Sequence, residues 1–291
     1  MKLLIIGDFQ GSFPKKLKKK IEEEEFDLVI GVGDYGGISE WRPWVMQNLK
    51  DSRAGREHLT AEEYFGKNKL KKLIKKDEEA TKKVFENMVS FEKPVISVFG
   101  NGDDEWYRYP FESHVPKLKK STIKFIKKMK NFKDITYKQA RFNKINFIGF
   151  GGYMDIESFL DKNVFPDAAE KKKYIERLNR LKKGKRDFFS RLKKIKGEKI
   201  FVFHYPPLGT FDIIRDKKDN PMNGKSAGIR FFREAIIKYK PLIAFCGHMH
   251  EYRGVKRIGK TLVIHPGDAE TGRYAVVEID KKNKIEVKLI K

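Results

Sequence analysis

The feature of the sequence that most constrains the fold is a series of short apolar runs, each ending at a glycine or a polar residue. The runs have the length of strands and are rich in β-branched or aromatic residues. Several are apolar at nearly every position, as is typical of strands covered on both faces. They predict a partly buried sheet with strands at residues 2–7, 28–33, 95–100, 145–151, 200–204, 242–247, 261–265, 274–279 and 285–290.

The segments between the first three runs have a helical pattern. Apolar residues recur there at helical spacing among many lysines, as at Leu70, Leu73, Ile74, Val84, Phe85 and Met88. This alternation predicts α/β architecture in the first part of the chain. The strands after residue 240 follow one another closely, which favours antiparallel pairing there.

Two segments are much longer than ordinary connections. Residues 35–93 and 153–198 separate neighbouring strands, and both are dominated by charge and helical pattern. Since connections within a compact domain are usually a few residues long, we expect helical insertions at about 38–92 and 154–198. With no internal repeat or flexible linker, residues 1–291 are expected to form one domain.

The charge balance bears on partners. The net charge is +24, which raises nucleic acid as a partner. Only 15 of the 64 basic residues are arginine, however, and a surface rich in Lys and Glu is also typical of thermophilic proteins. The lysine runs are spread along the chain, so they are interpreted chiefly as solvated helix faces, with nucleic-acid binding left open.

Cysteine usage and hydropathy bear on location. Cys246 is the only cysteine, so neither an intramolecular disulfide nor a cysteine metal cage can form. No stretch has the roughly 20 apolar residues that a membrane span needs, and Met1–Ile6 lacks the pattern of a signal peptide. We expect a cytoplasmic protein without a membrane partner.

Polar residues of metal-binding type stand where five apolar runs end. They lie in the stretches Gly7-Asp8-Phe9-Gln10, Gly33-Asp34, Gly100-Asn101-Gly102-Asp103, His204 and Gly247-His248-Met249-His250. The carboxyl ends of strands in an open α/β sheet converge on one crevice. Oxygen and nitrogen donors without thiolate suit Mn, Fe, Zn or Ni. The set is larger than one ion needs, and two ions roughly 3.5–4 Å apart that share a carboxylate would use all of it.

This series resembles the calcineurin-like metallophosphoesterase family, whose pattern is D-x-H, G-D, G-N-H-[DE], H and G-H-x-H in this order. The resemblance covers nearly the whole chain, since Ile264-His265-Pro266-Gly267-Asp268 is similar to the family's N-P-G-S element. It implies a four-layer sandwich of two mixed β-sheets flanked by helices. It also implies a phosphoric ester hydrolase with two divalent ions.

The resemblance also implies the roles of individual residues. Asp8 and His250 would hold one ion, with Gln10 at the position of the family's first histidine. The second ion would be held by Asn101, His204 and His248, and Asp34 would bridge the two. The nucleophile would be a metal-bound hydroxide. The candidate catalytic residues are therefore Asp34, Asn101, Asp103 and His204, with Asp103 expected to orient a ligand.

Two departures from the family pattern affect the expected chemistry. Gln10 offers an amide oxygen where the family has histidine, so we expect weaker binding of that ion. Gly102 replaces the histidine that commonly assists the leaving group, and Asp104 and His114 are candidate replacements. Loss of a positioned acid favours esters with good leaving groups. Members of the family that lack this histidine include phosphodiesterases, so the resemblance implies a diester over a monoester.

Several alternatives remain open from the sequence. His265 is equally compatible with a structural role and with a contact to the site, and Arg273 is expected to form an ordinary ion pair. The leading interpretation is a metal-dependent phosphodiesterase acting on a phosphate ester. A nuclease and a non-catalytic scaffold with a degenerate metal site are the alternatives. The natural substrate, the metals and the oligomeric state are not determined by the sequence.

Overall fold

The computed structural model describes residues 1–54, 56–57, 59–103, 125–156 and 168–291. These residues contain two six-stranded β-sheets. The first sheet has the order β12 (Ile285–Ile290), β11 (Tyr274–Ile279), β1 (Lys2–Ile6), β2 (Leu28–Gly31), β3 (Val95–Ser97) and β4 (Phe132–Asp134). The second has the order β5 (Gln139–Phe142), β6 (Ile145–Phe150), β7 (Lys199–Phe203), β8 (Ile243–Phe245), β10 (Thr261–His265) and β9 (Gly254–Ile258).

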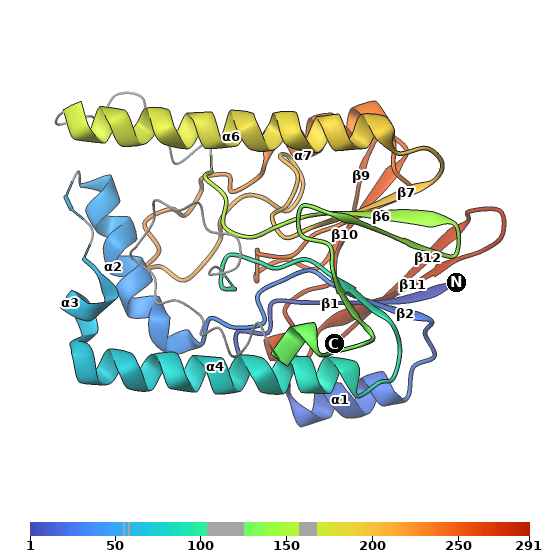
Figure 1. The fold of residues 1–291 in the computed structure, drawn as a ribbon, viewed down its shortest axis with the longest axis horizontal. Helices are drawn as coiled ribbons and strands as arrows, with labels where there is room; N and C mark the ends of the chain where they lie inside the picture. The colour runs from blue at the N-terminus through green and yellow to red at the C-terminus, as the bar shows by residue number, and fades with distance from the viewer. Residues whose placement is uncertain (55, 58, 104–124, 157–167) are drawn as a thin grey trace.

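Alternation along the strands builds a layered core. In β1, Leu3 and Ile5 face the second sheet, whereas Leu4 and Ile6 face the opposite way toward helices. The outer face of the first sheet is covered by α1 (Lys15–Glu22) and α4 (Lys67–Val89). The outer face of the second sheet is covered by α6 (Ala168–Lys194) and α7 (Arg230–Tyr239). The prediction of two mixed sheets flanked by helices in four layers is confirmed (Figure 1).

Strand direction places the polar loops together. Strands β1, β2 and β3 are parallel neighbours, as are β7 and β8. Their carboxyl ends therefore lie at one edge of each sheet. In Figure 1, β1 runs from the N-terminus at the right toward α2 (Arg42–Arg53) and α3 (Ala61–Phe65) at the left. The loops that carry the candidate ligands leave the sheets at this end.

The prediction of antiparallel pairing after residue 240 is partly wrong. Strand pairs β9/β10 and β11/β12 are antiparallel, but β8 pairs in parallel with both β7 and β10. The chain crosses from β8 to the edge strand β9 before it returns to β10. The sequence pattern misses β4, β5 and β9, which all lie at sheet edges. These three strands are partly exposed, so they lack a continuous apolar run.

The two long segments are largely helical where they are described. The first contains the short helix η1 (Ser39–Trp41), then α2, α3 and α4. A capping box at Thr60 and Glu63 starts α3, and Gly66 ends it. The second contains α6. That the chain forms a single domain, with these two segments as insertions, remains a prediction.

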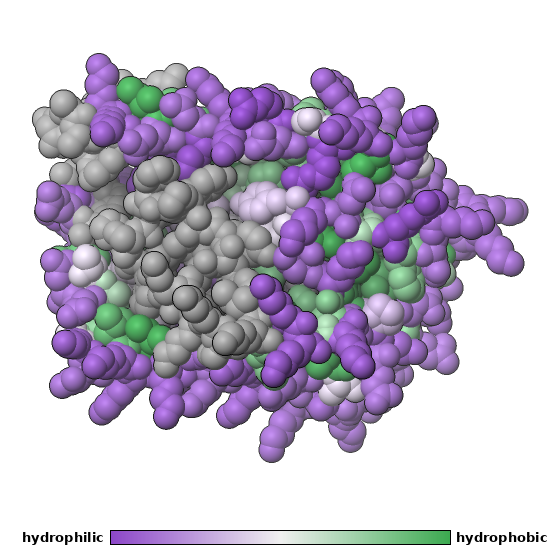
Figure 2. All heavy atoms as spheres, in the orientation of Figure 1, coloured by the Kyte–Doolittle hydropathy of each residue, from purple (hydrophilic) through white to green (hydrophobic). Residues whose placement is uncertain are grey.

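On the face shown in Figure 2, the coloured side chains are mostly hydrophilic, with smaller hydrophobic patches among them. Helices α1, α4 and α6 turn many of their lysines to solvent and bury one apolar side, as with Leu17 and Ile21 of α1. Within the described residues, none of the helices combines the length and the apolar character needed to traverse a bilayer.

Candidate metal centre

The candidate ligands come from five loops, each of which follows a strand. Asp8 and Gln10 follow β1, Asp34 follows β2, Asn101 follows β3, His204 follows β7, and His248 and His250 follow β8. The runs predicted as strands were too long at these ends. The chain leaves the ladder at Ile6, Gly31, Ser97 and Phe245, so the polar residues lie in loops that turn back over the sheet edge.

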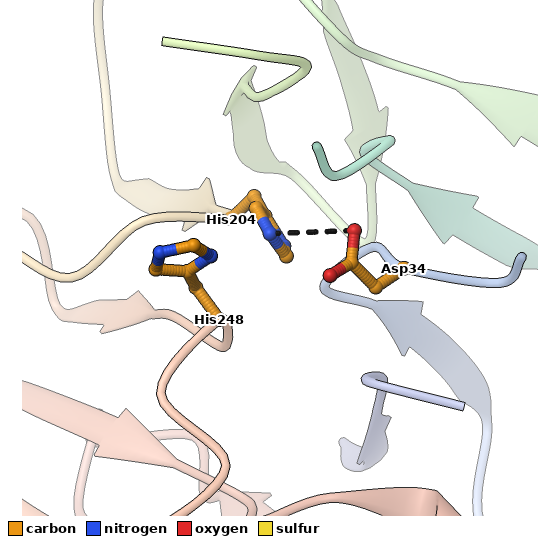
Figure 3. A group of neighbouring side chains, drawn as sticks. All are labelled: Asp34, His204 and His248. Atoms are coloured by element: carbon orange, nitrogen blue, oxygen red, sulfur yellow. Dashed lines mark ion pairs between the residues drawn. The ribbon is translucent and has the colours of Figure 1, made fainter. Parts of the chain in front are cut away.

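A first donor group consists of Asp34, His204 and His248. One ligand atom from each lies within 4.8 Å of the other two. The imidazole of His204 points toward the Asp34 carboxylate, with Nε2 at 3.5 Å from Oδ1, and His248 lies on its other side (Figure 3). Oδ1 of Asn101 lies 2.8 Å from Nε2 of His204 and 2.7 Å from Nδ1 of His248, so this amide joins the group.

A second donor group consists of Asp8, Asp34 and His250, again with one ligand atom from each within 4.8 Å of the others. Nε2 of His250 lies 3.9 Å from Oδ1 of Asp8. The main-chain N–H of His248 donates to both oxygens of the Asp8 carboxylate, at 3.0 and 3.1 Å. Asp8 is therefore held by the main chain of the loop that carries both histidines. Asp34 belongs to both donor groups.

Hydrogen bonds join the loop after β2 to the loop after β3. Oδ1 of Asp34 accepts a 2.6 Å hydrogen bond from the main-chain N–H of Gly102. Oδ1 of Asp103 accepts from the N–H groups of Tyr35 and Gly36, and Oδ2 accepts from Gly100. Asp103 is fully buried and contacts the backbone of both loops. Its carboxylate thus fixes the turn that carries Asp34.

The backbone adopts left-handed conformations at four of the seven candidate ligands. The φ angles are 55° at Asp8, 47° at Gln10, 54° at Asp34 and 72° at His248. Such a conformation is uncommon for residues with a side chain, and each instance costs about 1–2 kcal/mol. Strained conformations of this kind are more frequent at functional sites, where contacts with the surrounding structure maintain them.

Burial shifts the pKa values of the carboxylates upward. Desolvation raises the pKa of Asp8 well above its usual value, and the nearby Asp34 raises it further. Desolvation raises the pKa of Asp34 to about 6, opposed by the hydrogen bond from Gly102. It raises the pKa of Asp103 to about 7, with a further contribution from Asp34. Among the described residues, no lysine or arginine forms an ion pair with these three carboxylates.

Burial has the opposite effect on the histidines. It lowers the pKa of His204 to about 4 and that of His248 well below its usual value, so both imidazoles are neutral at neutral pH. Nδ1 of His204 lies 2.8 Å from the carbonyl oxygen of Val32 and must donate to it. Nε2 therefore presents a lone pair toward Asn101 and Asp34.

These residues fit divalent cations. In the first donor group, a lone pair of His204, the amide oxygen of Asn101 and a carboxylate oxygen of Asp34 converge, and all three are acceptors. A cation satisfies such a convergence and offsets the desolvation of the buried carboxylates. Metal–ligand bonds of about 2.0–2.2 Å bring the donors of one ion within about 4 Å of one another, close to the observed spacing.

Gln10 reaches the site, though with its amide nitrogen. Nε2 lies 3.3 Å from Oδ2 of Asp34 and 3.5 Å from Nε2 of His250. The sequence predicts the amide oxygen as the donor atom. Rotation of the amide group by 180° exchanges the two atoms, so the placement fits either a hydrogen bond to Asp34 or a ligand oxygen.

Two further predicted residues lie beside the site. Arg273 donates to Oδ1 of Asp268 at 2.9 Å and to the carbonyl oxygen of His250 at 3.3 Å, which matches the expected ion pair. His265 is fully buried; its Nδ1 accepts from the N–H of Gly267 at 3.2 Å, and its Nε2 has no hydrogen-bond partner among the described residues. Its role stays open. Asp104 and His114, the candidate replacements for the missing acid, lie outside the described residues.

Sequence patterns miss two residues that support the site. The ring of Tyr205 packs against His248 with centroids 4.1 Å apart, and its position next to His204 is the only signal for it. Asp77 of α4 accepts hydrogen bonds from the turn after Asp34. It stands among lysines and glutamates in the helical segment, and nothing in the local sequence distinguishes it.

Comparisons with known proteins identify the family and the fold of the chain. A family model described as metallophosphoesterase, calcineurin superfamily, matches residues 1–290. A solved crystal structure with 20% sequence identity covers 99% of this chain and 98% of its own, with a TM-score of 0.60. At that identity the likeness shows the fold. A dimetal phosphatase from Danio rerio, 12% identical, covers 99% of this chain and 95% of its own with a TM-score of 0.48.

One curated relative is an uncharacterised protein from Methanocaldococcus jannaschii. It is 30% identical over 149 residues, which amount to 50% of this chain and 59% of the relative. The match thus spans less than two thirds of the relative's length.

Proposed function

The chain belongs to the metallophosphoesterase family of the calcineurin superfamily, and we propose that it hydrolyses a phosphodiester with the help of two divalent cations. The observation that carries this proposal is the position of Asp34, whose carboxylate belongs to both donor groups. A carboxylate shared by two groups of donors is the arrangement that a pair of closely spaced ions requires.

The proposal assigns the ligands as follows. Asp8, Gln10, Asp34 and His250 would hold one ion, and Asp34, Asn101, His204 and His248 the other. Bound divalent cations would neutralise charge on the phosphoryl oxygens and lower the pKa of water. Mn, Fe, Ni and Zn all match a set of imidazole, amide and carboxylate donors.

The residues of the chain contribute orientation and charge state. The Val32 carbonyl fixes the tautomer of His204, and burial keeps this imidazole neutral, so it can act as a ligand over a wide pH range. Gly102 orients Asp34, and Asp103 holds the turn behind it. These contacts fix the donor atoms before substrate binds, which is how a preorganised site lowers a barrier.

The preference for diesters is inferred from Gly102. The residue at this position contributes a main-chain N–H and has no side chain that could protonate a leaving oxygen. Without a positioned acid, hydrolysis depends more on the leaving group's own stability as an anion. Esters with good leaving groups should therefore be hydrolysed faster than esters with poor ones. The choice of a diester over a monoester comes from the family resemblance, since members that lack this histidine include phosphodiesterases.

The test combines metal analysis with two substrates. Metal-free protein is loaded with Mn, Fe, Ni or Zn, its metal content is measured by mass spectrometry, and hydrolysis of bis-p-nitrophenyl phosphate is compared with that of p-nitrophenyl phosphate. Two ions per chain, faster turnover of the diester and loss of activity in Asp34→Asn are expected. Faster turnover of the monoester would refute the diester preference. No bound metal and no turnover would favour the scaffold alternative.

A nuclease is the second candidate, and the exposed lysines of α6 favour it. Lys171, Lys172, Lys182, Lys183, Lys193 and Lys194 are all exposed on this helix. Phosphate contacts made by such residues weaken steeply with salt. Binding of a fluorescent oligonucleotide that falls with rising salt, together with its cleavage, would support this candidate. Absence of binding at low salt would exclude it.

A further inference from the structure

The turn that follows Asp34 is held by a carboxylate from outside the sheets. Asp77 lies on α4 and is 8% exposed. Its Oδ1 accepts hydrogen bonds from the main-chain N–H groups of Gly37 and Ile38, at 2.9 and 3.3 Å. Its Oδ2 accepts from the indole N–H of Trp41 at 2.9 Å. One side chain of the first helical segment thus receives three donors from residues 37–41.

The same turn touches the loops on both sides of it. The carbonyl oxygen of Asp34 accepts from the N–H groups of Phe9 and Gln10, at 2.8 and 3.3 Å. The carbonyl oxygen of Tyr35 accepts from Gly11 at 3.0 Å. With the bonds from this turn to Asp103, residues 34–38 connect the loop after β1 to the loop after β3. A shift of this turn would therefore move ligands of both donor groups.

The turn is packed between α4 and the site residues. A Cβ atom added to Gly37 would lie 3.4 Å from Cα of Gly102 and 3.5 Å from Oε1 of Gln10. A Cβ atom added to Gly36 would lie 2.6 Å from Oγ1 of Thr81, one turn beyond Asp77 on α4. The helix therefore presses against one side of the turn, and the site residues lie against the other.

We infer that Asp77 is a positioning residue for the metal centre, which sets the place of Asp34 and Gln10 through the Gly37–Ile38 backbone. Its removal would leave two main-chain N–H groups and one indole N–H without their acceptor in a buried place, so the turn would move to find new partners. The inference rests on one part of the proposed function, the binding of metal ions by the donor groups, and it does not depend on the hydrolysis of an ester. It assigns the first helical segment a task in the site in addition to covering the sheet.

The test is the affinity of the metal-free protein for Mn²⁺ alone, measured by isothermal titration calorimetry. Asp77→Ala should weaken binding about 10-fold or more, the usual effect of losing a supporting contact behind a metal ligand. Asp77→Asn keeps an acceptor for Gly37 and Ile38 but can turn its amide N–H groups toward Trp41. A smaller loss is expected, and it should be recovered when Trp41→Phe is added.

Asp51→Ala is the matched control. Asp51 is also a buried carboxylate of the first helical segment, but its side chain pairs with Gln47 and Arg56. Its substitution should lower the melting temperature and leave Mn²⁺ affinity unchanged. The electron paramagnetic resonance spectrum of bound Mn²⁺ should change in the Asp77 variants. In Asp51→Ala it should be the same as in the wild type.

The outcomes separate this inference from the proposed function. Mn²⁺ affinity equal to wild type in folded Asp77→Ala would overturn the inference and leave the phosphoesterase untouched. If that variant does not fold, unchanged affinity in Asp77→Asn would overturn it equally. Wild-type protein that binds Mn²⁺ without hydrolysing any ester would refute the proposed activity only. Wild-type protein that binds none of Mn, Fe, Ni or Zn would overturn both.

Discussion

The main-chain N–H of Gly102 donates a 2.6 Å hydrogen bond to Oδ1 of Asp34, the carboxylate shared by the two donor groups. The family pattern has a histidine at this position. Here the backbone orients the shared carboxylate, and the absence of a side chain lets it come close. Gly102 thus has two effects: the chain lacks the histidine that would serve as an acid at this position, and Asp34, a candidate ligand, is held in place.

A side chain at position 102 is expected to disturb Asp34. A Cβ atom on this residue would lie 3.1 Å from Oδ1 and 3.3 Å from Cγ of Asp34. We expect Gly102→Ala to weaken Mn²⁺ binding by about 10-fold, because it displaces a contact behind the shared ligand. Gly102→His should behave similarly and should not raise monoester hydrolysis. Calorimetric titration with Mn²⁺ and turnover of p-nitrophenyl phosphate measure both effects. Undiminished affinity with restored monoesterase activity would contradict this account of Gly102.

The two donor groups should be separable by substitution. His250 belongs only to the group with Asp8, whereas His204 and His248 belong only to the other. His250→Ala is therefore expected to reduce the bound metal from two ions to one and to leave the His204 group filled. Metal content by mass spectrometry after gel filtration tests this. Loss of both ions in His250→Ala, with the fold intact by circular dichroism, would show that the groups do not bind independently.

Restoring a histidine at position 10 should strengthen the weaker ion site. The side chain of Gln10 already lies within 3.3–3.5 Å of Asp34 and His250, and its φ of 47° is a conformation that histidine tolerates. An imidazole is a better ligand than an amide for Mn, Zn or Ni. Gln10→His should hold its ion at chelator concentrations that strip the wild type. Faster loss of metal from the variant would argue against Gln10 as a ligand position.

Metal binding should depend on pH through Asp34. Its pKa in the metal-free protein is about 6, raised by burial, so protons compete with cations below this value. His204, with a pKa of about 4, does not compete above pH 5. Because the folded protein holds this proton more tightly than the unfolded chain, the contribution of Asp34 to metal-free stability should fall as pH rises from about 4 to about 7. The increase in melting temperature caused by Mn²⁺ should therefore be larger at about pH 7.5 than at about pH 5. A constant increase between those two pH values would exclude Asp34 as a titrating ligand.

A buried ion pair on α6 should matter for stability and leave the metals bound. Asp155, 4% exposed, accepts from Nε of Arg180 at 2.9 Å and from its Nη2 at 3.4 Å. The pair connects the loop after β6 to α6. Asp155→Ala should lower the free energy of unfolding by about 2 kcal/mol, because it removes the carboxylate that accepts two charge-assisted hydrogen bonds from a mostly buried guanidinium. Urea denaturation measures the loss. Metal content should equal that of the wild type, and a drop would show that α6 also supports the metal centre.

Much of the fold and the membership of the site could be predicted from the sequence. Continuous apolar runs are a local signal of strands covered on both faces, and alternation is the signal of a half-exposed strand such as β12. One of these signals marks nine of the twelve strands in the part of the chain that the structure describes. The order of the polar motifs after those runs was enough to name Asp8, Asp34, Asn101, His204, His248 and His250, and the structure brings these side chains together. The metal-binding roles given to them remain part of the proposal.

The tertiary structure decided the remaining features, and each depends on segments far apart in the chain. The edge strands β4, β5 and β9 form because a neighbouring strand offers them partners, and their own sequences are too polar to show it. The hydrogen bond from Gly102 to Asp34 joins residues 68 positions apart, and that from Gly37 to Asp77 joins residues 40 apart. Hydrophobic periodicity reports how one segment meets the core. Hydrogen bonds between loops form only when several segments that are distant in sequence fold next to one another. The pattern within one segment gives no information about those neighbours.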